Sequence, residues 1–154
     1  MRIFFLATAL LLSVSATSFA QMIDYHWDTH GVGFSIPRDF GVQTNNSEEF
    51  TADNGQIFLS IAPVQDETIT RDNLAEVVVA MATAMTYDSI EEAAEADVDD
   101  FTGYYVKGTK DGVNAVVMAL LDSESSTNLI VVIAYADGME AKAIEIANSF
   151  YAYD

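Results

Sequence analysis

Four residues near the start of the sequence carry side chains able to bind a metal ion. Asp24, His26, Asp28 and His30 occupy every second position, so on one extended strand all four would project from the same face. Imidazole and carboxylate groups together can bind Zn²⁺ or Cu²⁺. Because side chains two positions apart on a strand are about 6.6 to 7 Å apart at their bases, two neighbours can share an ion and the whole row cannot. Gly31 also indicates that the strand ends near His30.

The same segment has a simpler interpretation as a half-buried strand. The alternate positions in Met22–Asp28 are apolar and would face a core: Ile23, Tyr25 and Trp27. Alternation of this kind is typical of a strand with one solvent-exposed face. The sequence favours this interpretation, and the metal hypothesis stays open for His26 with Asp24 or Asp28.

A second cluster of carboxylates lies between Asp88 and Asp100, a segment with seven acidic residues and no basic one. Asp97, Asp99 and Asp100 suggest a Ca²⁺ loop. The EF-hand pattern would then require glycine at position 102 and glutamate at position 108, where the sequence has Thr102 and Gly108. That motif is therefore excluded, and a looser acidic site for divalent cations stays open.

Motifs typical of the common hydrolases are absent from the sequence. It contains no cysteine, no Gly-x-Ser-x-Gly elbow and no glycine-rich phosphate loop. A serine triad would have to use His26 or His30, and no serine stands out as its partner. We therefore expect no catalytic residue, no cofactor and a protein that is not an enzyme.

The amino-terminal segment resembles a secretory signal peptide. Met1 and Arg2 are followed by the apolar run Ile3–Leu12, and the segment ends Ser18-Phe19-Ala20. Small residues at the third-last and last positions are typical of signal peptidase sites. The apolar run is shorter than the roughly 20 residues that span a bilayer. We expect residues 1–20 to be removed after Ala20, which leaves one domain, residues 21–154, in the periplasm or outside the cell.

The charge of the chain limits its partners. Asp and Glu number 24 against six Lys and Arg, a net charge of −18 at pH 7. Such a surface repels nucleic acid and anionic lipid, and it suits cationic partners, divalent ions or a saline habitat. The hydrophobic content of 51% argues against disorder. With no cysteine, neither disulfides nor a lipid-modified amino-terminal cysteine can form.

The segments that would form the core are clear in the second half of the chain. Val113–Leu121 and Asn128–Tyr135 are apolar in both strand phases, as in central strands covered on both faces. Lys110-Asp111-Gly112 before the first of them is a hairpin signal, as is Asp53-Asn54-Gly55 earlier in the chain. The other expected strands are Met22–Asp28, Gly33–Ile36, Phe50–Ala52, Gln56–Ala62 and Gly103–Thr109.

Two amphipathic helices are expected. Arg71–Tyr87 has apolar residues at helical spacing after a potential N-cap at Thr70, and Met139–Tyr151 follows Asp137 and Glu140, which resemble a capping box. We expect Arg38–Ser47 to be a polar connection. Asp88–Asp100 could be an edge strand, a helix extension or a loop. The order of elements predicts an α+β fold with helices on both sides of one mostly antiparallel sheet.

The chain resembles the PsbP-like superfamily, which includes DcrB-like bacterial envelope proteins. The matching segments are Gly33-Phe34-Ser35-Ile36-Pro37 with Phe40, Phe50–Gly55 leading into Ile57–Pro63, and Asn148-Ser149-Phe150 at the end of the closing helix. The resemblance implies a sheet of six to seven antiparallel strands between helices, and an accessory, binding or assembly role. DcrB-like members are commonly lipoproteins, whereas this chain lacks the cysteine that a lipid anchor requires.

Together these observations predict a secreted, non-catalytic binding or accessory protein. Its partner would be a protein or a cationic small molecule, with weak binding of divalent cations at the acidic surface, no nucleic acid and no membrane insertion after signal cleavage. The alternative is a metal-binding protein or metal-dependent hydrolase that uses His26 with Asp24 or Asp28.

Overall fold

A computed structural model describes residues 20–125 and 127–153; the expected signal peptide lies, except for Ala20, outside them. The elements in these ranges are β1 (Met22–Trp27), the 3₁₀ helix η1 (Asp28–His30), β2 (Val32–Pro37), β3 (Gly41–Asn45), β4 (Phe50–Asp53), β5 (Ile57–Pro63), α1 (Leu74–Ala84), β6 (Ser89–Ile90), β7 (Ala94–Glu95), β8 (Phe101–Lys110), β9 (Val113–Asp122), β10 (Asn128–Tyr135), α2 (Glu140–Ala147) and β11 (Tyr151–Ala152). No helix of the described ranges has the length and apolar character needed to cross a bilayer.

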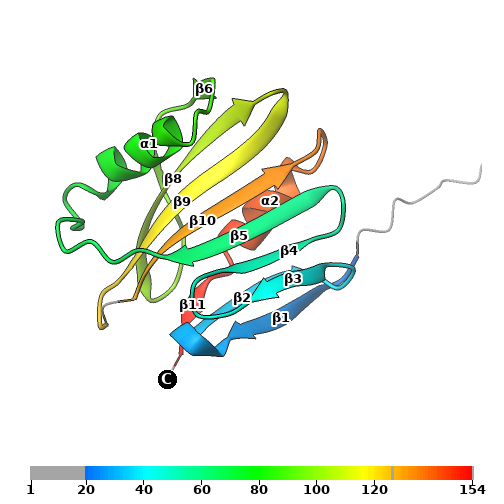
Figure 1. The fold of residues 1–154 in the computed structure, drawn as a ribbon, viewed down its shortest axis with the longest axis horizontal. Helices are drawn as coiled ribbons and strands as arrows, with labels where there is room; N and C mark the ends of the chain where they lie inside the picture. The colour runs from blue at the N-terminus through cyan, green and yellow to red at the C-terminus, as the bar shows by residue number, and fades with distance from the viewer. Residues whose placement is uncertain (1–19, 126, 154) are drawn as a thin grey trace, which may run out of the picture.

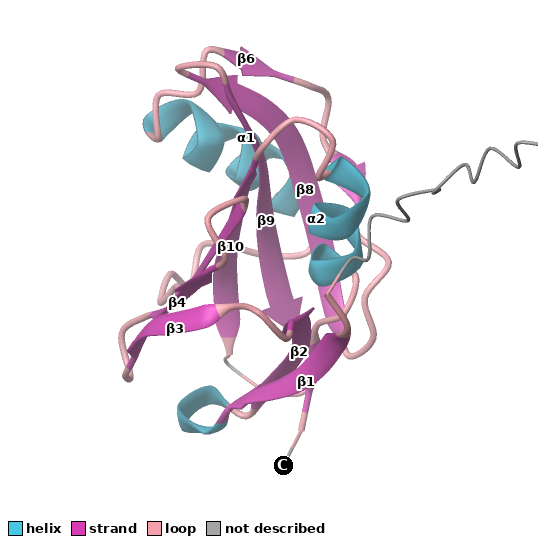
Figure 2. Ribbon diagram, turned by 90° about the vertical axis from the view of Figure 1, so that its right-hand side faces the viewer, coloured by secondary structure: helices cyan, strands magenta, loops and turns pink. Residues whose placement is uncertain are grey.

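The main sheet has eight antiparallel strands in the order β3-β4-β5-β10-β9-β8-β6, with β7 also paired to β8. Helix α1 packs on one face and α2 on the other, as Figures 1 and 2 show from two directions. The predicted α+β class, with helices on both sides of an antiparallel sheet, is confirmed. The predicted number of strands, six to seven, was too low.

Strand β9 separates two cores. Val116, Met118 and Leu120 face the core that includes α2, while Val117 and Ala119 face the core beneath α1. In β10, Val131 is fully buried and pairs with Met118. The prediction of a central strand covered on both faces is confirmed for Val113–Leu121. Asn128–Tyr135 is central as well, but only its Val131 face is fully buried, because α1 packs on β8 and β9 and leaves the opposite face of β10 half-buried.

We had expected the amino-terminal strand to join the main sheet, and this prediction is wrong. The strand forms a separate three-stranded sheet in the order β1-β2-β11. This small sheet packs through Phe34, whose ring centroid lies 5.1 Å from those of both Phe50 and Phe150. Trp27 is fully buried and its Nε1 donates a hydrogen bond to the carbonyl oxygen of Asn46 (2.9 Å). Apolar alternation marks a buried face but does not specify which sheet a strand joins.

The closing helix is shorter than the predicted Met139–Tyr151. It ends at Ala147, and the residues after Phe150 form β11, which pairs Tyr151 with Gly33. Phe150 is buried at a position that continues the helical stripe, so the spacing of apolar residues did not reveal where the helix ends. The free edge of β2 supplies backbone hydrogen-bond partners that another helical turn would not use.

Two polar segments contain strands that the sequence did not predict. The expected connection Arg38–Ser47 contains β3, a bulged edge strand whose side chains are nearly all exposed, so it has no buried alternation to recognise. The uncertain segment Asp88–Asp100 contains β6 and β7, two residues each, paired with β8.

Helix α1 is also shorter than the predicted Arg71–Tyr87, and its N-cap residue is Asn73 in place of Thr70. The Asn73 side chain accepts a hydrogen bond from the backbone N–H of Thr70 (2.8 Å) and donates one to the carbonyl oxygen of Thr68 (2.8 Å). These bonds hold residues 68–73 in turns. The chain therefore reaches helical geometry only at Leu74.

Candidate functional site

A row of three residues crosses the outer face of the small sheet. Gly33 in β2 pairs with His26 on one side and with Tyr151 on the other. A Cβ atom on Gly33 would lie 2.2 Å from Cζ of Tyr151, so the tyrosine ring occupies the space that a side chain would fill. Its hydroxyl lies 2.9 Å from Nε2 of His26, with which it shares a hydrogen bond.

Tyr153 adds a second ring to this cluster. Its ring centroid is 4.7 Å from that of His26, and its hydroxyl donates a hydrogen bond to Oδ1 of Asp28. That hydrogen bond, together with burial and the negative charge of Asp28, raises the pKa of Tyr153 to about 12. The phenol of Tyr153 is therefore neutral near pH 7 and acts as a hydrogen-bond donor.

The side chains of the proposed metal row, Asp24, His26, Asp28 and His30, each form a hydrogen bond with a different residue. Asp24 accepts a hydrogen bond from Oγ of Ser35 (3.3 Å), and His30 Nε2 donates to the carbonyl oxygen of Ser47 (2.8 Å). Asp28 and His30 lie in η1, beyond the end of the strand that holds Asp24 and His26. The strand ends at Trp27, and Gly31, with its φ of 63°, follows η1.

Across the described residues, no group of three or more histidine, aspartate or glutamate side chains is arranged to hold a metal ion. Binding of one ion by His26 with a single carboxylate therefore stays a hypothesis from the sequence.

Two aspartates of the suggested Ca²⁺ loop, Asp99 and Asp100, form hydrogen bonds that hold the turn before β8. Asp100, with φ of 61°, accepts a hydrogen bond through Oδ2 from the backbone N–H of Ala152 (3.2 Å). The backbone oxygen of Asp99 accepts one from the N–H of Phe101 (2.7 Å). The turn before β8 therefore fastens β11, while the looser cation site stays an untested prediction.

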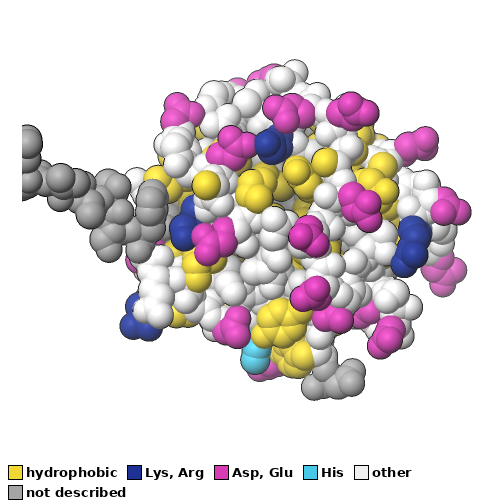
Figure 3. All heavy atoms as spheres, turned by 180° about the vertical axis from the view of Figure 1, so that it is seen from behind, with side chains coloured by type: hydrophobic (Ala, Val, Ile, Leu, Met, Phe, Trp, Pro, Cys, Tyr) yellow, Lys and Arg dark blue, Asp and Glu magenta, His cyan; other side chains and the backbone are white. Residues whose placement is uncertain are grey.

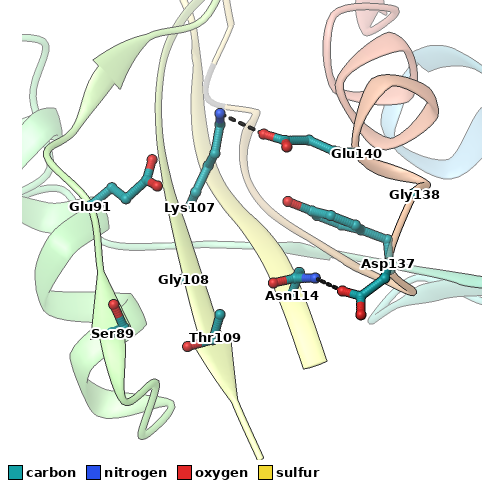
Figure 4. Close-up of a pocket in the computed structure, with 10 residues that line it drawn as sticks. Ser89, Glu91, Lys107, Gly108, Thr109, Asn114, Asp137, Gly138 and Glu140 are labelled. Carbon is teal, nitrogen blue, oxygen red and sulfur yellow. Dashed lines mark hydrogen bonds and ion pairs between the residues drawn. The ribbon is translucent and has the colours of Figure 1, made fainter. Parts of the chain in front are cut away.

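A polar pocket lies on the α2 face of the main sheet, beside the amino-terminal end of α2. The strand register places four side chains in one row across β6, β8, β9 and β10: Ser89, Thr109, Asn114 and Tyr135. The next row contains Lys107, whose carbonyl oxygen accepts a hydrogen bond from the N–H of Glu91 (2.8 Å). The cavity volume is about 250 Å³, and its lining also includes Gly108, Asp137, Gly138 and Glu140. Figure 4 shows Glu91 and Glu140 on opposite sides of Lys107.

Charge is unevenly distributed in this Lys107 pocket. Nζ of Lys107 lies 2.7 Å from Oε1 of Glu140, and this hydrogen-bonded ion pair is the main reason that the pKa of Lys107 is raised; the charge of Glu91 adds to it, and burial opposes it. Asp137 accepts a hydrogen bond from Nδ2 of Asn114 (3.0 Å). The lining therefore contains three carboxylates, those of Glu91, Asp137 and Glu140, and one ammonium group, so the pocket has a negative net charge.

Tyr135 forms the buried part of the pocket lining and is 6% exposed. Burial, and next the charge of Glu140, raise the pKa of its phenol, while Lys107 lowers it. The hydroxyl is therefore neutral near pH 7 and can both donate and accept a hydrogen bond.

Sequence reasoning missed this pocket and assigned two of its residues to another role. Asp137 and Glu140 were predicted to form a capping box, but the N-cap residue of α2 is Met139, with no side-chain cap. Their carboxylates instead contact Asn114 and Lys107. The available signal was the change from apolar to polar side chains at the ends of β8 and β9, on the face that is otherwise buried.

Comparisons with known proteins give a fold and no family. No family model matches the sequence, and no curated protein matches it. Among solved structures, LpqN of Mycobacterium tuberculosis, described as involved in cell envelope biogenesis, aligns with 87% of this chain and 91% of its own at 11% identity and a TM-score of 0.52.

A protein from Bacteroides thetaiotaomicron aligns with 80% of this chain at 12% identity and a TM-score of 0.50. This chain spans about half of the Bacteroides chain, of which 46% is covered. At such identities the likeness concerns the fold alone, and the resemblance to the PsbP-like superfamily is not confirmed. The chain thus shares its α+β fold with bacterial proteins, one of them described as acting in cell envelope biogenesis.

Proposed function

We propose that this chain is a secreted, non-catalytic binding or accessory protein of a bacterial cell envelope, and that the Lys107 pocket holds a small polar ligand with a positive charge. The observation that carries the proposal is the pairing of Lys107 with Glu140: this one ammonium group is ion-paired with Glu140 and only attracted by Glu91, so the three carboxylates of the lining keep a surplus of negative charge. A ligand ammonium or guanidinium group would neutralise this surplus.

The size and lining of the pocket limit the ligand further. Pockets for drug-sized ligands measure roughly 300–1,000 Å³, so a cavity of about 250 Å³ suits a compact molecule. Ser89, Thr109 and Asn114 line the pocket with hydroxyl and amide groups. These groups can exchange hydrogen bonds with hydroxyl groups of a ligand. An amino sugar or an amino-acid derivative has this combination of hydroxyl or amide groups and a positive charge.

Two observations support an envelope location. LpqN, which has a similar fold, is described as involved in cell envelope biogenesis, and the sequence begins with a segment that resembles a signal peptide. The surface charge is compatible with cationic ligands. Figure 3 shows acidic side chains spread over one whole face and basic side chains standing singly.

The test is a titration of the protein, residues 21–154, with glucosamine, N-acetylglucosamine, glucose and arginine methyl ester. Binding is measured by NMR from the changes in amide chemical shifts. Glucosamine and glucose have the same ring and differ by the ammonium group. We expect the charged probes alone to shift the amides of Lys107 and Asn114, and Glu91→Gln or Asp137→Asn to weaken binding by about tenfold.

Glu145→Gln is the matched control, because Glu145 lies on α2 and pairs with Lys142 outside the pocket. The proposal is wrong if glucose binds as tightly as glucosamine, if the Glu145 variant weakens binding as much as the pocket variants do, or if no probe shifts these amides at millimolar concentration.

A further inference from the structure

The α1 face of the main sheet is only partly covered. Helix α1 packs on β8 and β9, and Figure 1 looks onto this face, where β10, β5 and β4 have no helix in front of them. The uncovered strands present apolar side chains in register: Ala134 beside Phe58, and Ile130 beside Ala62. Phe58 is exposed and the other three are half-buried, with Ile130 packed against the core beneath α1.

Two exposed apolar side chains lie at one end of this face. Phe58 is 37% exposed and Val113 is 49% exposed, and both line a single hollow of about 410 Å³ with Ala134. Large apolar side chains that gather around one hollow are typical of surfaces that bind another molecule. Phe58 and Val113 come from different hairpins, so the structure assembles this group from distant parts of the chain.

Carboxylates border the hollow. Asp53 pairs with Phe58 in the sheet register, and Asp137, which follows β10, is also part of the lining. Their hydrogen bonds are to neutral groups: Asp53 accepts from Gln43 and from the N–H of Gly55, and Asp137 accepts from Asn114. The lining residues include no lysine or arginine among the described part of the chain.

The charge determines which partner suits this surface. A second copy of the chain would bring another net charge of −18 against it, which disfavours association of two copies. The backbone groups of β5 and β10 already pair with strands on both sides, so a partner cannot add as a further strand there. Recognition must use side chains, apolar in the centre and positively charged at the rim.

We propose that Phe58, Val113 and Ala134, with Asp53 and Asp137 at the rim, form a docking surface for a basic segment of a partner protein. The segment inserts an apolar or aromatic side chain beside Phe58 and places a lysine or arginine against Asp53 or Asp137. Asp137 also lines the Lys107 pocket, whereas Phe58, Val113 and Asp53 do not, so the two sites can be tested separately.

The experiment measures binding of three synthetic peptides that contain Arg-Trp-Arg, Glu-Trp-Glu or Arg-Ser-Arg in the same neutral flanks. We expect only the Arg-Trp-Arg peptide to shift the amides of Phe58 and Val113, with an affinity that falls as NaCl rises. Phe58→Ser and Val113→Ser should each weaken binding by about tenfold, and Asp53→Asn should reduce its salt dependence.

Val79→Ser is the control, because Val79 is a similarly exposed apolar residue, 36% exposed, that lies on α1 and does not line the hollow. The melting temperature of each variant verifies its fold, and the two serine variants are independent of one another. The proposal is overturned if the Glu-Trp-Glu peptide binds equally well, if Val79→Ser has the same effect as Phe58→Ser, or if no peptide binds at millimolar concentration. Sedimentation that shows a dimer abolished by Phe58→Ser would also overturn it, in favour of a second copy.

Discussion

His26 and Tyr151 share a hydrogen bond of 2.9 Å although 125 positions separate them in the sequence. The bond spans Gly33, whose missing side chain leaves room for the tyrosine ring. One glycine therefore decides whether the last strand can lie against β2 with its tyrosine across the sheet. It also decides whether His26 has a partner from the carboxyl-terminal end of the chain.

Gly33→Ala should displace Tyr151, because the added Cβ would lie 2.2 Å from its ring. We expect a loss of about 1–3 kcal/mol in the free energy of unfolding, as for other overpacked sites. Urea denaturation measures it. Gly41→Ala is the control, since a Cβ there lies 3.9 Å from its nearest neighbour, the backbone oxygen of Asp53. Equal stability of the two variants would contradict the role of Gly33.

The raised pKa of Tyr153 predicts that the free energy of unfolding decreases at high pH. Its pKa is about 10 in the unfolded chain and rises to about 12 in the folded protein. Folding therefore favours the neutral phenol. The contribution is complete below about pH 10 and is lost as the pH rises towards 12.

We expect Tyr153→Phe to show a smaller decrease in stability between pH 9 and 11 than the unaltered protein, measured by urea denaturation at each pH. Tyr25→Phe is a suitable comparison, because the hydroxyl of Tyr25 hydrogen-bonds to the amide of Asn45, whereas that of Tyr153 hydrogen-bonds to a carboxylate. A decrease with pH that is unchanged in Tyr153→Phe would contradict the assignment.

Replacing Val131 with aspartate should destabilise the protein by several kcal/mol, because it buries an unpaired charge in a fully buried position of β10. Thermal unfolding followed by circular dichroism measures the effect. Val42→Asp in β3 is the control, since Val42 is 42% exposed and an added carboxylate there stays in water. We expect a change within about 0.5 kcal/mol for the control.

The metal hypothesis for His26 can be decided by elemental analysis. The protein is purified without a histidine tag and compared with His26→Ala. Because His26 shares its Nε2 with Tyr151 and the neighbouring carboxylates bond to Ser35 and Tyr153, we expect no stoichiometric zinc or copper in either sample. About one equivalent of metal that is lost in the variant would establish the alternative function.

The sequence predicted the features that depend on local spacing. Strands β9 and β10 were recognisable because their apolar residues occur in both phases. The hairpin turns were recognisable because Asp and Gly tolerate positive φ, and Asp111, Gly112 and Gly55 adopt φ values of 51°, 77° and 83°. These signals depend on neighbours in sequence, and tertiary packing agrees with them.

The features that the sequence did not predict depend on contacts between distant segments. β3 is polar and exposed, so only its pairing with β4 makes it a strand. The Lys107 pocket requires the register of β6, β8, β9 and β10 together, which no local pattern specifies. The pairing of His26 with Tyr151 likewise depends on a strand that ends the described chain.

The small sheet joins the two ends of the described chain, and this has a consequence for biosynthesis. Synthesis releases the amino-terminal part first, so β1 and β2 exist before β11 is available. A chain that stops before Phe150 lacks one of the two rings stacked on Phe34 and exposes the apolar surface that Phe150 covers. Chaperones and proteases act on exposed apolar surface, so prematurely ended chains would be recognised and removed. Synthesis through Phe150 is thereby a condition for a chain to escape this removal.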